Sequence, residues 1–278
     1  MAIDIKVSGG VDFSAYLADF AANFAPSGRG AFSNGLNGDE YTLWEGDGAT
    51  PPIEDGRAFV VDSGDAGDLA YDFMTHTVGG TIDSLDFGTG VTDLGGGDYE
   101  TASQLLLSGL DLESTGADGI VNKLITDLMA GKTDVLLSLL KNADLNFEGS
   151  NKADVFTGFK GDDVVDGGKG ADVLSGGKGA DELIGGKGLD VLTGGKGHDV
   201  FTFGKNSGHD VITDFAAGKG QGDVIDFTGG QFDSFEDVLA AASTNADGDV
   251  VITIDGKNSI TLEGVSIDDL HGNDFLFG

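Results

Sequence analysis

The chain has 278 residues, enough for one or two domains, and its 48 acidic residues against 15 basic ones give a formal net charge of −33. That charge excludes nucleic acids and anionic membrane surfaces as favourable partners. The absence of cysteine excludes disulfides and thiol chemistry. No apolar run reaches the ~20 residues of a membrane-spanning helix. The first residues lack the basic and apolar regions of an amino-terminal signal peptide, so we expect none.

Residues 1–148 predict an α+β domain. Apolar residues recur every three or four positions in three segments that we expect to be helices, residues 11–24, 117–130 and 133–142. Alternating apolar residues between glycines predict strands at 57–63, 68–75 and 80–87, and we expect the glycine-rich segment 28–52 to be loop. This order favours an antiparallel sheet with helices on one face.

Residues 149–203 contain six tandem copies of a nonapeptide, of which Gly176-Gly-Lys-Gly-Ala-Asp181 followed by Glu-Leu-Ile184 is typical. The pattern is the calcium-binding G-G-x-G-x-D-x-U-x repeat of parallel β-helices. The first six residues predict a turn and the last three a short strand. The middle residue of each strand should point inward: Phe156, Val165, Leu174, Leu183, Leu192 and Phe201.

Two repeats should complete one coil, so that aspartates eighteen residues apart lie above one another. Carboxylates and turn carbonyls form the all-oxygen shell that calcium prefers. The predicted ligands are Asp154, Asp163, Asp172, Asp181, Asp190 and Asp199, with Gly168, Gly170, Gly177, Gly179, Gly186, Gly188, Gly195 and Gly197. A flexible linker would explain the glycines but not the strict spacing of the aspartates. Without calcium the carboxylates would repel one another, and we expect the segment to be disordered.

These repeats resemble those of the RTX family of secreted bacterial proteins. The resemblance implies an all-β parallel β-roll that folds when it meets calcium outside the cell. Residues 204–278 are then the cap of the roll and a carboxyl-terminal secretion signal, with a helix at 235–242 and a hairpin of strands at 249–255 and 259–263. The tail from Asp268 to Gly278 is similar to the signals that type I secretion machinery reads. The expected location is extracellular, either released or held at the cell surface.

Tyr71 and His76 flank the short stretch Tyr71-Asp-Phe-Met-Thr-His76. By spacing alone, a tyrosine packed in the core and a surface histidine are the commoner case. The functional alternative is a tyrosinate metal ligand, because a histidine within hydrogen-bond distance could hold the phenol proton.

Several stretches of residues 1–148 resemble the HasA-type hemophores, secreted bacterial proteins that capture haem and deliver it to an outer-membrane receptor. The matching stretches include Gly67-Asp-Leu-Ala-Tyr71, Ile82-Asp-Ser-Leu-Asp-Phe-Gly88 and Asp118-Gly-Ile-Val-Asn-Lys123. The resemblance implies a curved antiparallel sheet backed by helices, with Tyr71 as the axial iron ligand and His76 as its hydrogen-bonding partner. The sequence departs from that family in two ways: residues 24–35 contain no histidine, and the Tyr71–His76 spacing is short.

No catalytic motif is present, since both H-E-x-x-H and G-x-S-x-G are missing from the sequence. We therefore expect a binding protein and not an enzyme. The leading hypothesis is a secreted calcium-binding protein that captures extracellular haem for iron acquisition, with a haem receptor or haem-carrying protein as partner. The alternative is a structural or adhesive protein of the cell surface or a biofilm, whose hemophore-like domain binds no haem.

Overall fold

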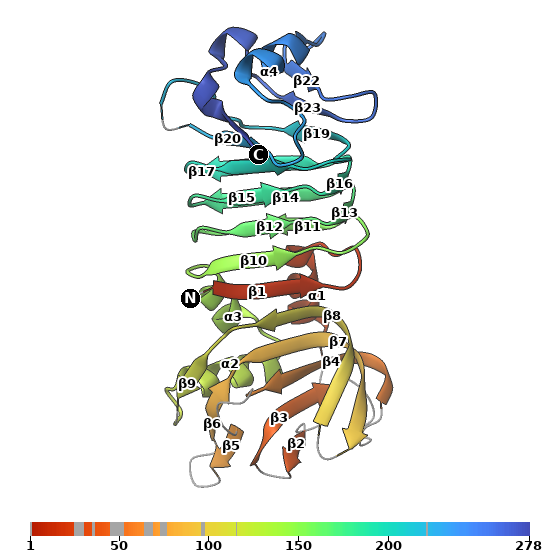
Figure 1. Ribbon diagram of the computed structural model, residues 1–278. Helices are drawn as coiled ribbons and strands as arrows, with labels where there is room; N and C mark the ends of the chain where they lie inside the picture. Colours follow the sequence, from red (N-terminus) through yellow and green to blue (C-terminus); the bar gives the residue numbers. More distant parts are fainter. Residues whose placement is uncertain are drawn as a thin grey trace. The chain divides into compact units, whose positions relative to one another are not determined.

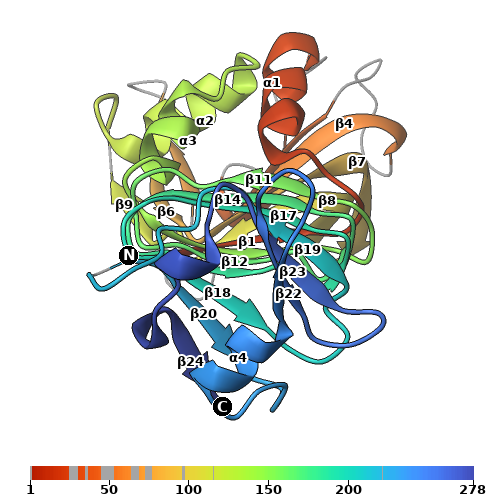
Figure 2. The ribbon, with the colours of Figure 1, turned by 90° about the horizontal axis from the view of Figure 1, so that it is seen from above.

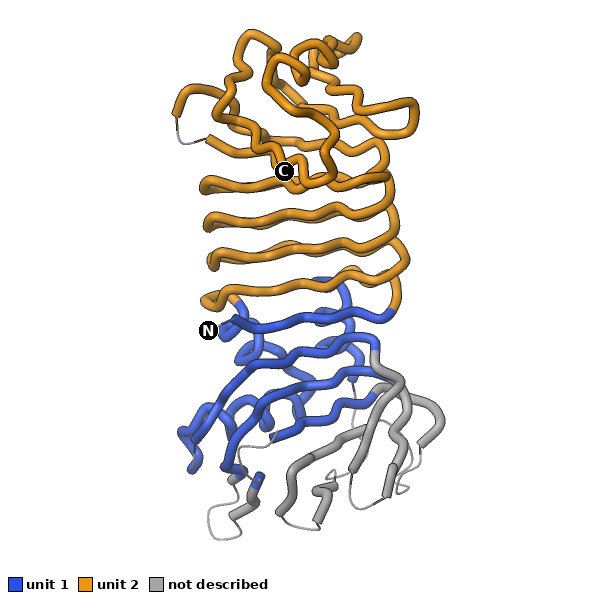
Figure 3. The backbone as a smooth tube through the Cα atoms, in the orientation of Figure 1, with its two compact units in different colours: residues 1–8, 14–140 blue, residues 9–13, 141–278 orange. Residues whose placement is uncertain are grey.

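The computed structural model describes residues 2–278 except 25–30, 35–36, 45–52, 64–68, 73–76, 96–97, 115 and 221 (Figure 1). The chain divides into two compact units, coloured separately in Figure 3. Unit 1 consists of Met1–Ser8 and Ser14–Leu140, and unit 2 of Gly9–Phe13 and Lys141–Gly278. The second unit thus takes in residues 141–148, which lie before the predicted boundary, and a short segment near the amino terminus.

Unit 1 is built on antiparallel strands. They pair in the order β1, β8, β7, β4, β3, β5, β6 and β9, and β2 also pairs with β3. Their bounds are β1 Ala2–Val7, β2 Ala31–Asn34, β3 Asn37–Trp44, β4 Ile53–Asp62, β5 Leu69–Asp72, β6 Thr77–Ile82, β7 Ser84–Gly95, β8 Asp98–Ser108 and β9 Leu112–Ser114.

The helices of this region are α1 Phe13–Asn23, α2 Ile120–Met129 and α3 Asp134–Leu140. Figure 2 shows them together on one side of strands β4, β7 and β8. Phe20 of α1 lies 5.1 Å from Phe87 and 6.2 Å from Phe59, measured between ring centroids. All three predicted helices are present, and the mainly sheet architecture with few helices agrees with the predicted class.

The expected loop at 28–52 was wrong in part, because strands β2 and β3 both lie within it. Residues Glu40 to Trp44 of β3 pair with Ala58 to Asp62 of β4. Glycine content alone suggested a loop, but pairing with a neighbouring strand supplies backbone hydrogen bonds that local sequence does not reveal. The predicted strand at 80–87 is also divided at Asp83, where β6 ends and β7 begins.

In unit 2 the chain passes alternately between two sets of strands, which Figure 1 shows as successive rungs. One set runs β10 Asp144–Glu148, β12 Val164–Asp166, β15 Glu182–Ile184, β18 Val200–Phe203, β20 Val224–Phe227 and β24 Phe275–Phe277, all parallel. The other runs β11 Val155–Thr157, β14 Val173–Lys178, β17 Val191–Lys196, β19 His209–Ile212 and β23 Ser259–Leu262, also parallel. A short pair, β13 Lys169–Gly170 and β16 Lys187–Gly188, joins neighbouring turns.

Within the nonapeptides, the core of unit 2 is a column of single apolar side chains, one from each three-residue strand segment. The six residues predicted to point inward are at most 1% exposed, which confirms the predicted phase of the repeat. Phe147 stacks on Phe156 with centroids 4.2 Å apart. Because each coil adds few apolar side chains, the column depends on being closed at both ends.

The two ends of this column are closed by different elements. At the start, Val11 accepts a hydrogen bond from the Val155 amide (2.8 Å), and the Phe13 ring lies 5.5 Å from Phe156. At the far end, β22 Val250–Thr253 forms an antiparallel hairpin with β23, and β21 Ala242–Thr244 pairs with β22. Helix α4 Phe235–Ala241 and the 3-10 helices η2 Ile267–Asp269 and η3 Gly272–Asp274 complete the cap. The predicted helix and hairpin of this region are confirmed.

Candidate calcium and haem sites

The aspartates of the nonapeptides form two carboxylate ladders in unit 2. One ladder contains Asp154, Asp172 and Asp190, and the other Asp163, Asp181 and Asp199; each of these residues is at most 1% exposed. In each ladder the backbone N–H of one aspartate donates to Oδ1 of the aspartate eighteen residues later, over 2.8–3.0 Å. The stacking predicted from the sequence spacing is therefore present.

Both ladders extend beyond the repeats, which sequence spacing did not reveal. The Asp190 amide donates to Oδ1 of Asp210 (3.1 Å), and the Asp199 amide to Oδ1 of Asp223 (3.0 Å). At the start, the Val11 amide donates to Oδ1 of Asp154 over 2.7 Å. The spacing at the far end is 20 and 24 residues instead of 18, so a strict nonapeptide register misses Asp210 and Asp223.

The second carboxylate oxygen, Oδ2, distinguishes the aspartates from one another. In four of them Oδ2 is buried and has no hydrogen-bond partner among the described residues: Asp172, Asp181, Asp190 and Asp199. At Asp154, by contrast, Oδ2 accepts hydrogen bonds from the Ser150 amide (2.7 Å) and hydroxyl (2.9 Å). A buried carboxylate oxygen without a partner is costly, and a bound cation would satisfy it.

The glycine that opens each repeat bounds the space beside these oxygens. A Cβ atom added at Gly167 would lie 2.6 Å from Oδ2 of Asp172 and 2.9 Å from the carbonyl oxygen of Gly185. Calcium is bound by oxygen ligands, and the carboxylate of Asp172 and the carbonyl of Gly185, which both approach this glycine, are oxygens of that kind. The residues present therefore fit a calcium ion on the basis of orphaned oxygens and donor chemistry.

Burial has changed the acidity of the ladder carboxylates. Desolvation raises the pKa of Asp163, Asp172 and Asp190 to about 6 and that of Asp181 to about 7, although the backbone hydrogen bonds to these carboxylates oppose the rise. Desolvation likewise raises the pKa of Asp210 to about 7. A cation beside the ladder would favour the charged form and reverse this effect.

The predicted glycine ligands serve first as turn residues. Gly168 and Gly186 have φ angles of 83° and 90°, a left-handed conformation in which other residues are strained. The carbonyl of Gly168 also accepts a hydrogen bond from the Lys187 amide over 2.9 Å. Among the described residues, no three His, Cys, Asp or Glu side chains gather into a metal-binding group. An ion on a ladder would therefore need backbone carbonyls as well as carboxylates.

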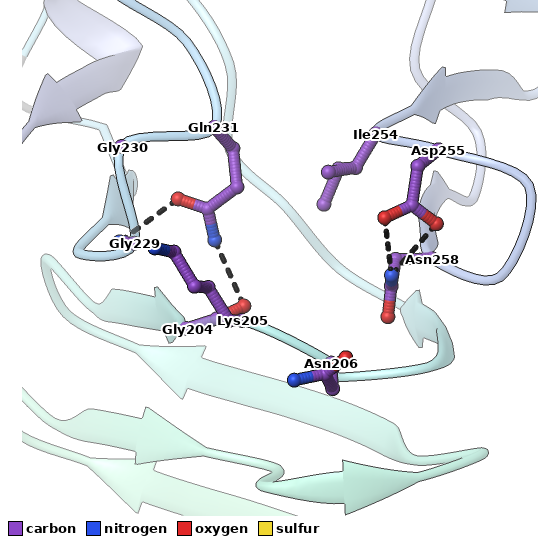
Figure 4. A pocket seen from close by; sticks show the side chains of 9 residues that line it. All are labelled: Gly204, Lys205, Asn206, Gly229, Gly230, Gln231, Ile254, Asp255 and Asn258. Carbon is purple, nitrogen blue, oxygen red and sulfur yellow. Dashed lines mark hydrogen bonds between the residues drawn. The ribbon is translucent and has the colours of Figure 1, made fainter.

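A pocket of about 330 Å³ lies in unit 2 where the last coil meets the cap (Figure 4). Several of its polar groups bond to one another or to the backbone. The Gln231 side-chain amide donates to the carbonyls of Phe203 (3.0 Å) and Gly204 (2.8 Å), and the Asn258 amide donates to both oxygens of Asp255. These contacts indicate a role in fastening the cap to the coil.

The predicted haem ligands lie on the hairpin of β5 and β6. Tyr71 pairs with Val78 through the backbone, and Asp72 pairs with Thr77, so residues 73–76 connect the two strands. His76 lies outside the described residues, as do parts of the loop predicted at 28–52. The hairpin is fastened to α2, because the Val78 amide donates to Oδ1 of Asn122 over 2.8 Å.

Comparison with known families decides the identity of the chain. The profile of the Heme-binding protein A (HasA) family matches residues 8–173, more than half of the sequence. The chain belongs to the HasA family. The RTX calcium-binding nonapeptide profile matches residues 166–201 and 175–212. RTX repeats bind calcium, HasA proteins bind haem, and proteins of both families are typically secreted.

The chain is also similar to several solved structures. The apo and holo forms of the hemophore HasA from Yersinia pestis are each 25% identical to this chain. Each match covers 50% of this chain, and it covers 86% of the apo protein and 88% of the holo protein. The TM-scores are 0.40 and 0.41. The AlgE6R3 subunit of a mannuronan C5-epimerase from Azotobacter vinelandii is 30% identical, with 47% of this chain and 81% of that one covered and a TM-score of 0.39. No curated protein sequence matches the chain. No helix among the described residues has both the length and the apolar character needed to cross a membrane.

Proposed function

We propose that this HasA-family protein captures extracellular haem through Tyr71 and carries the haem-binding unit on an RTX calcium β-roll. In this proposal, the alternating parallel strands of unit 2 are the roll, and the ladder aspartates with the turn carbonyls hold calcium. The protein binds its ligand and does not catalyse a reaction. Export through type I secretion machinery and delivery of haem to an outer-membrane receptor or another haem-carrying protein, for iron acquisition, complete the proposal.

The observation that carries the haem proposal is the family match over residues 8–173, which includes the β5–β6 hairpin. Haem, when bound, supplies an iron atom that accepts a phenolate oxygen. A phenol loses its proton near pH ~10, so Tyr71 needs a neighbouring base to act as a ligand at neutral pH. His76, close in sequence on the same hairpin, is the residue proposed to hold that proton.

A haemin titration of the full chain in calcium tests this proposal. We expect a shifted Soret band that saturates at one haemin per chain and is lost in Tyr71→Phe. The matched control is Tyr16→Phe, a tyrosine of α1, which should bind haemin as the unchanged protein does. His76→Ala should weaken binding at neutral pH and recover as the pH is raised, because phenol ionisation no longer needs the imidazole.

A different outcome would favour the alternative function. If calcium-loaded protein shows no Soret shift but forms oligomers in light scattering when calcium is added, the haem proposal is wrong. The chain would then be better described as a surface or biofilm protein that retains the HasA fold.

A further inference from the structure

The coil that follows the last nonapeptide repeats the geometry of the carboxylate ladder. Val191 pairs with Val211 and Leu192 with Ile212, in parallel. The Asp190 amide donates to Oδ1 of Asp210 over 3.1 Å, as the amide of each earlier aspartate does to the next one on its ladder. Asp210 is 1% exposed, as deeply buried as the aspartates of the repeats.

The turn of this coil also has the backbone geometry of the nonapeptide turns, although its sequence does not match the repeat. Gly208 forms a bridge with Gly188, which places Asn206 in register with Gly186. Asn206 has a φ angle of 62°, close to the 90° of Gly186, and it is one of two non-glycine residues with positive φ in the described part of the chain. Asparagine tolerates this left-handed conformation better than most residues. Figure 4 shows Asn206 on the segment that leads into this coil.

The orphaned oxygen of Asp172 lies where its own turn meets the next coil. A Cβ added at Gly167 would meet Oδ2 of Asp172 at 2.6 Å and the Gly185 carbonyl of the following coil at 2.9 Å. Among the described residues Oδ2 of Asp190 has no hydrogen-bond partner; it lies 2.7 Å from a Cβ added at Gly185, and the coil of Asn206 and Asp210 is the next one in the parallel register. A buried carboxylate oxygen in this position lacks a positively charged partner.

We propose that a calcium ion binds between Asp190 and Asp210, beyond the nonapeptide repeats, and joins the last repeat to the coil that supports the cap. The proposal rests on calcium binding by the roll and deepens it.

Counting bound calcium in matched variants of the full chain tests this assignment. Protein stripped with a chelator is dialysed against calcium, and the ions bound per chain are measured by metal analysis. Asp210→Asn keeps the size of the side chain and a hydrogen-bond acceptor, and it should bind one ion fewer than the unchanged protein. Asp247→Asn, at an exposed position of the cap outside both ladders, should bind the same number as the unchanged protein. Equal counts for Asp210→Asn and the unchanged protein would overturn the proposal.

Direct location of the ions covers the case in which Asp210→Asn fails to fold. Crystals of the unchanged chain grown in calcium should show an anomalous scattering peak between Asp190 and Asp210. Peaks on other aspartate pairs with none at this position would refute the further inference and leave the calcium function intact. A chain that binds no calcium at all would instead refute the calcium function itself.

Discussion

Removing calcium should unfold unit 2 at neutral and alkaline pH. Four buried Oδ2 atoms, those of Asp172, Asp181, Asp190 and Asp199, have no hydrogen-bond partner within the part of the chain that the structure describes. At ~1–3 kcal/mol for each unsatisfied buried group, the combined cost is about 4–12 kcal/mol. A whole domain is stable by only ~5–15 kcal/mol, so this cost is enough to decide whether the unit folds.

Far-UV circular dichroism and hydrogen exchange measure the effect. At pH 8 with a chelator, we expect the strand signal to fall, and amides of β14, β17 and β18 to lose their protection. Calcium should restore both, whereas magnesium at the same concentration should not, because magnesium demands a tighter octahedral shell. If the strand signal and amide protection at pH 8 are unchanged by the chelator, the apolar column alone holds the unit and the reasoning from orphaned oxygens is wrong.

The pH dependence of the calcium-free protein gives a second, independent readout. The folded-state pKa values of Asp172 and Asp190, raised to about 6, and of Asp181, raised to about 7, exceed the ~3.9 of an unfolded aspartate. The folded state therefore holds more protons across this window, and its stability is greatest below pH ~4 and is lost as the pH rises toward ~7. Strand signal should return at pH 5 in the presence of chelator. Calcium binding should change in the opposite direction and weaken as protons compete below pH ~6.

Two further predictions separate packing from ion binding. Phe156→Ala, which removes a ring stacked on Phe147, should destabilise the calcium-loaded protein by about 3–5 kcal/mol in denaturant unfolding, whereas Val173→Ala at a 48% exposed position should change it by less than about 0.5 kcal/mol. Gly176→Ala would place a Cβ 2.6 Å from Cγ of Asp181. Because such overpacking costs about 1–3 kcal/mol, the calcium concentration at half-saturation should rise several-fold. A calcium titration of Gly176→Ala that overlays that of the unchanged protein would contradict the second prediction.

The interior of unit 2 could be predicted from sequence because one short rule repeats. Each copy puts an apolar residue at the eighth position and an aspartate at the sixth, so the inward column and both ladders follow from counting. In unit 1, helices α2 and α3 were predictable from their apolar periodicity, since the buried residues Leu124, Leu128 and Leu136 follow it. The strands β2 and β3 were not, because their pairing with β4 is decided by partners distant in sequence.

The ends of the ladders could not be read by counting. Asp210 and Asp223 follow at spacings of 20 and 24 residues, so only the three-dimensional register identifies them. The first repeat, which begins at Gly149, gives a local signal that could have been used: Ser150 stands where the last four copies have glycine, and a hydroxyl at that position can satisfy the carboxylate of Asp154. The placement of Gly9–Phe13 in unit 2 has no such signal, because no residue near Val11 resembles the repeat.

The order of the units along the chain argues that calcium and haem binding are linked by folding. The chain contributes Met1–Ser8 to unit 1, Gly9–Phe13 to unit 2, and then Ser14–Leu140 to unit 1. Within unit 2, that short segment is held by the bond from the Val11 amide to Asp154, which forms only when the first coil is ordered. Since the segment leads directly into α1, ordering the coil also fixes where the first helix can begin and lowers the entropy lost when it packs. We therefore expect calcium, bound only in unit 2, to favour folding of the unit that carries Tyr71.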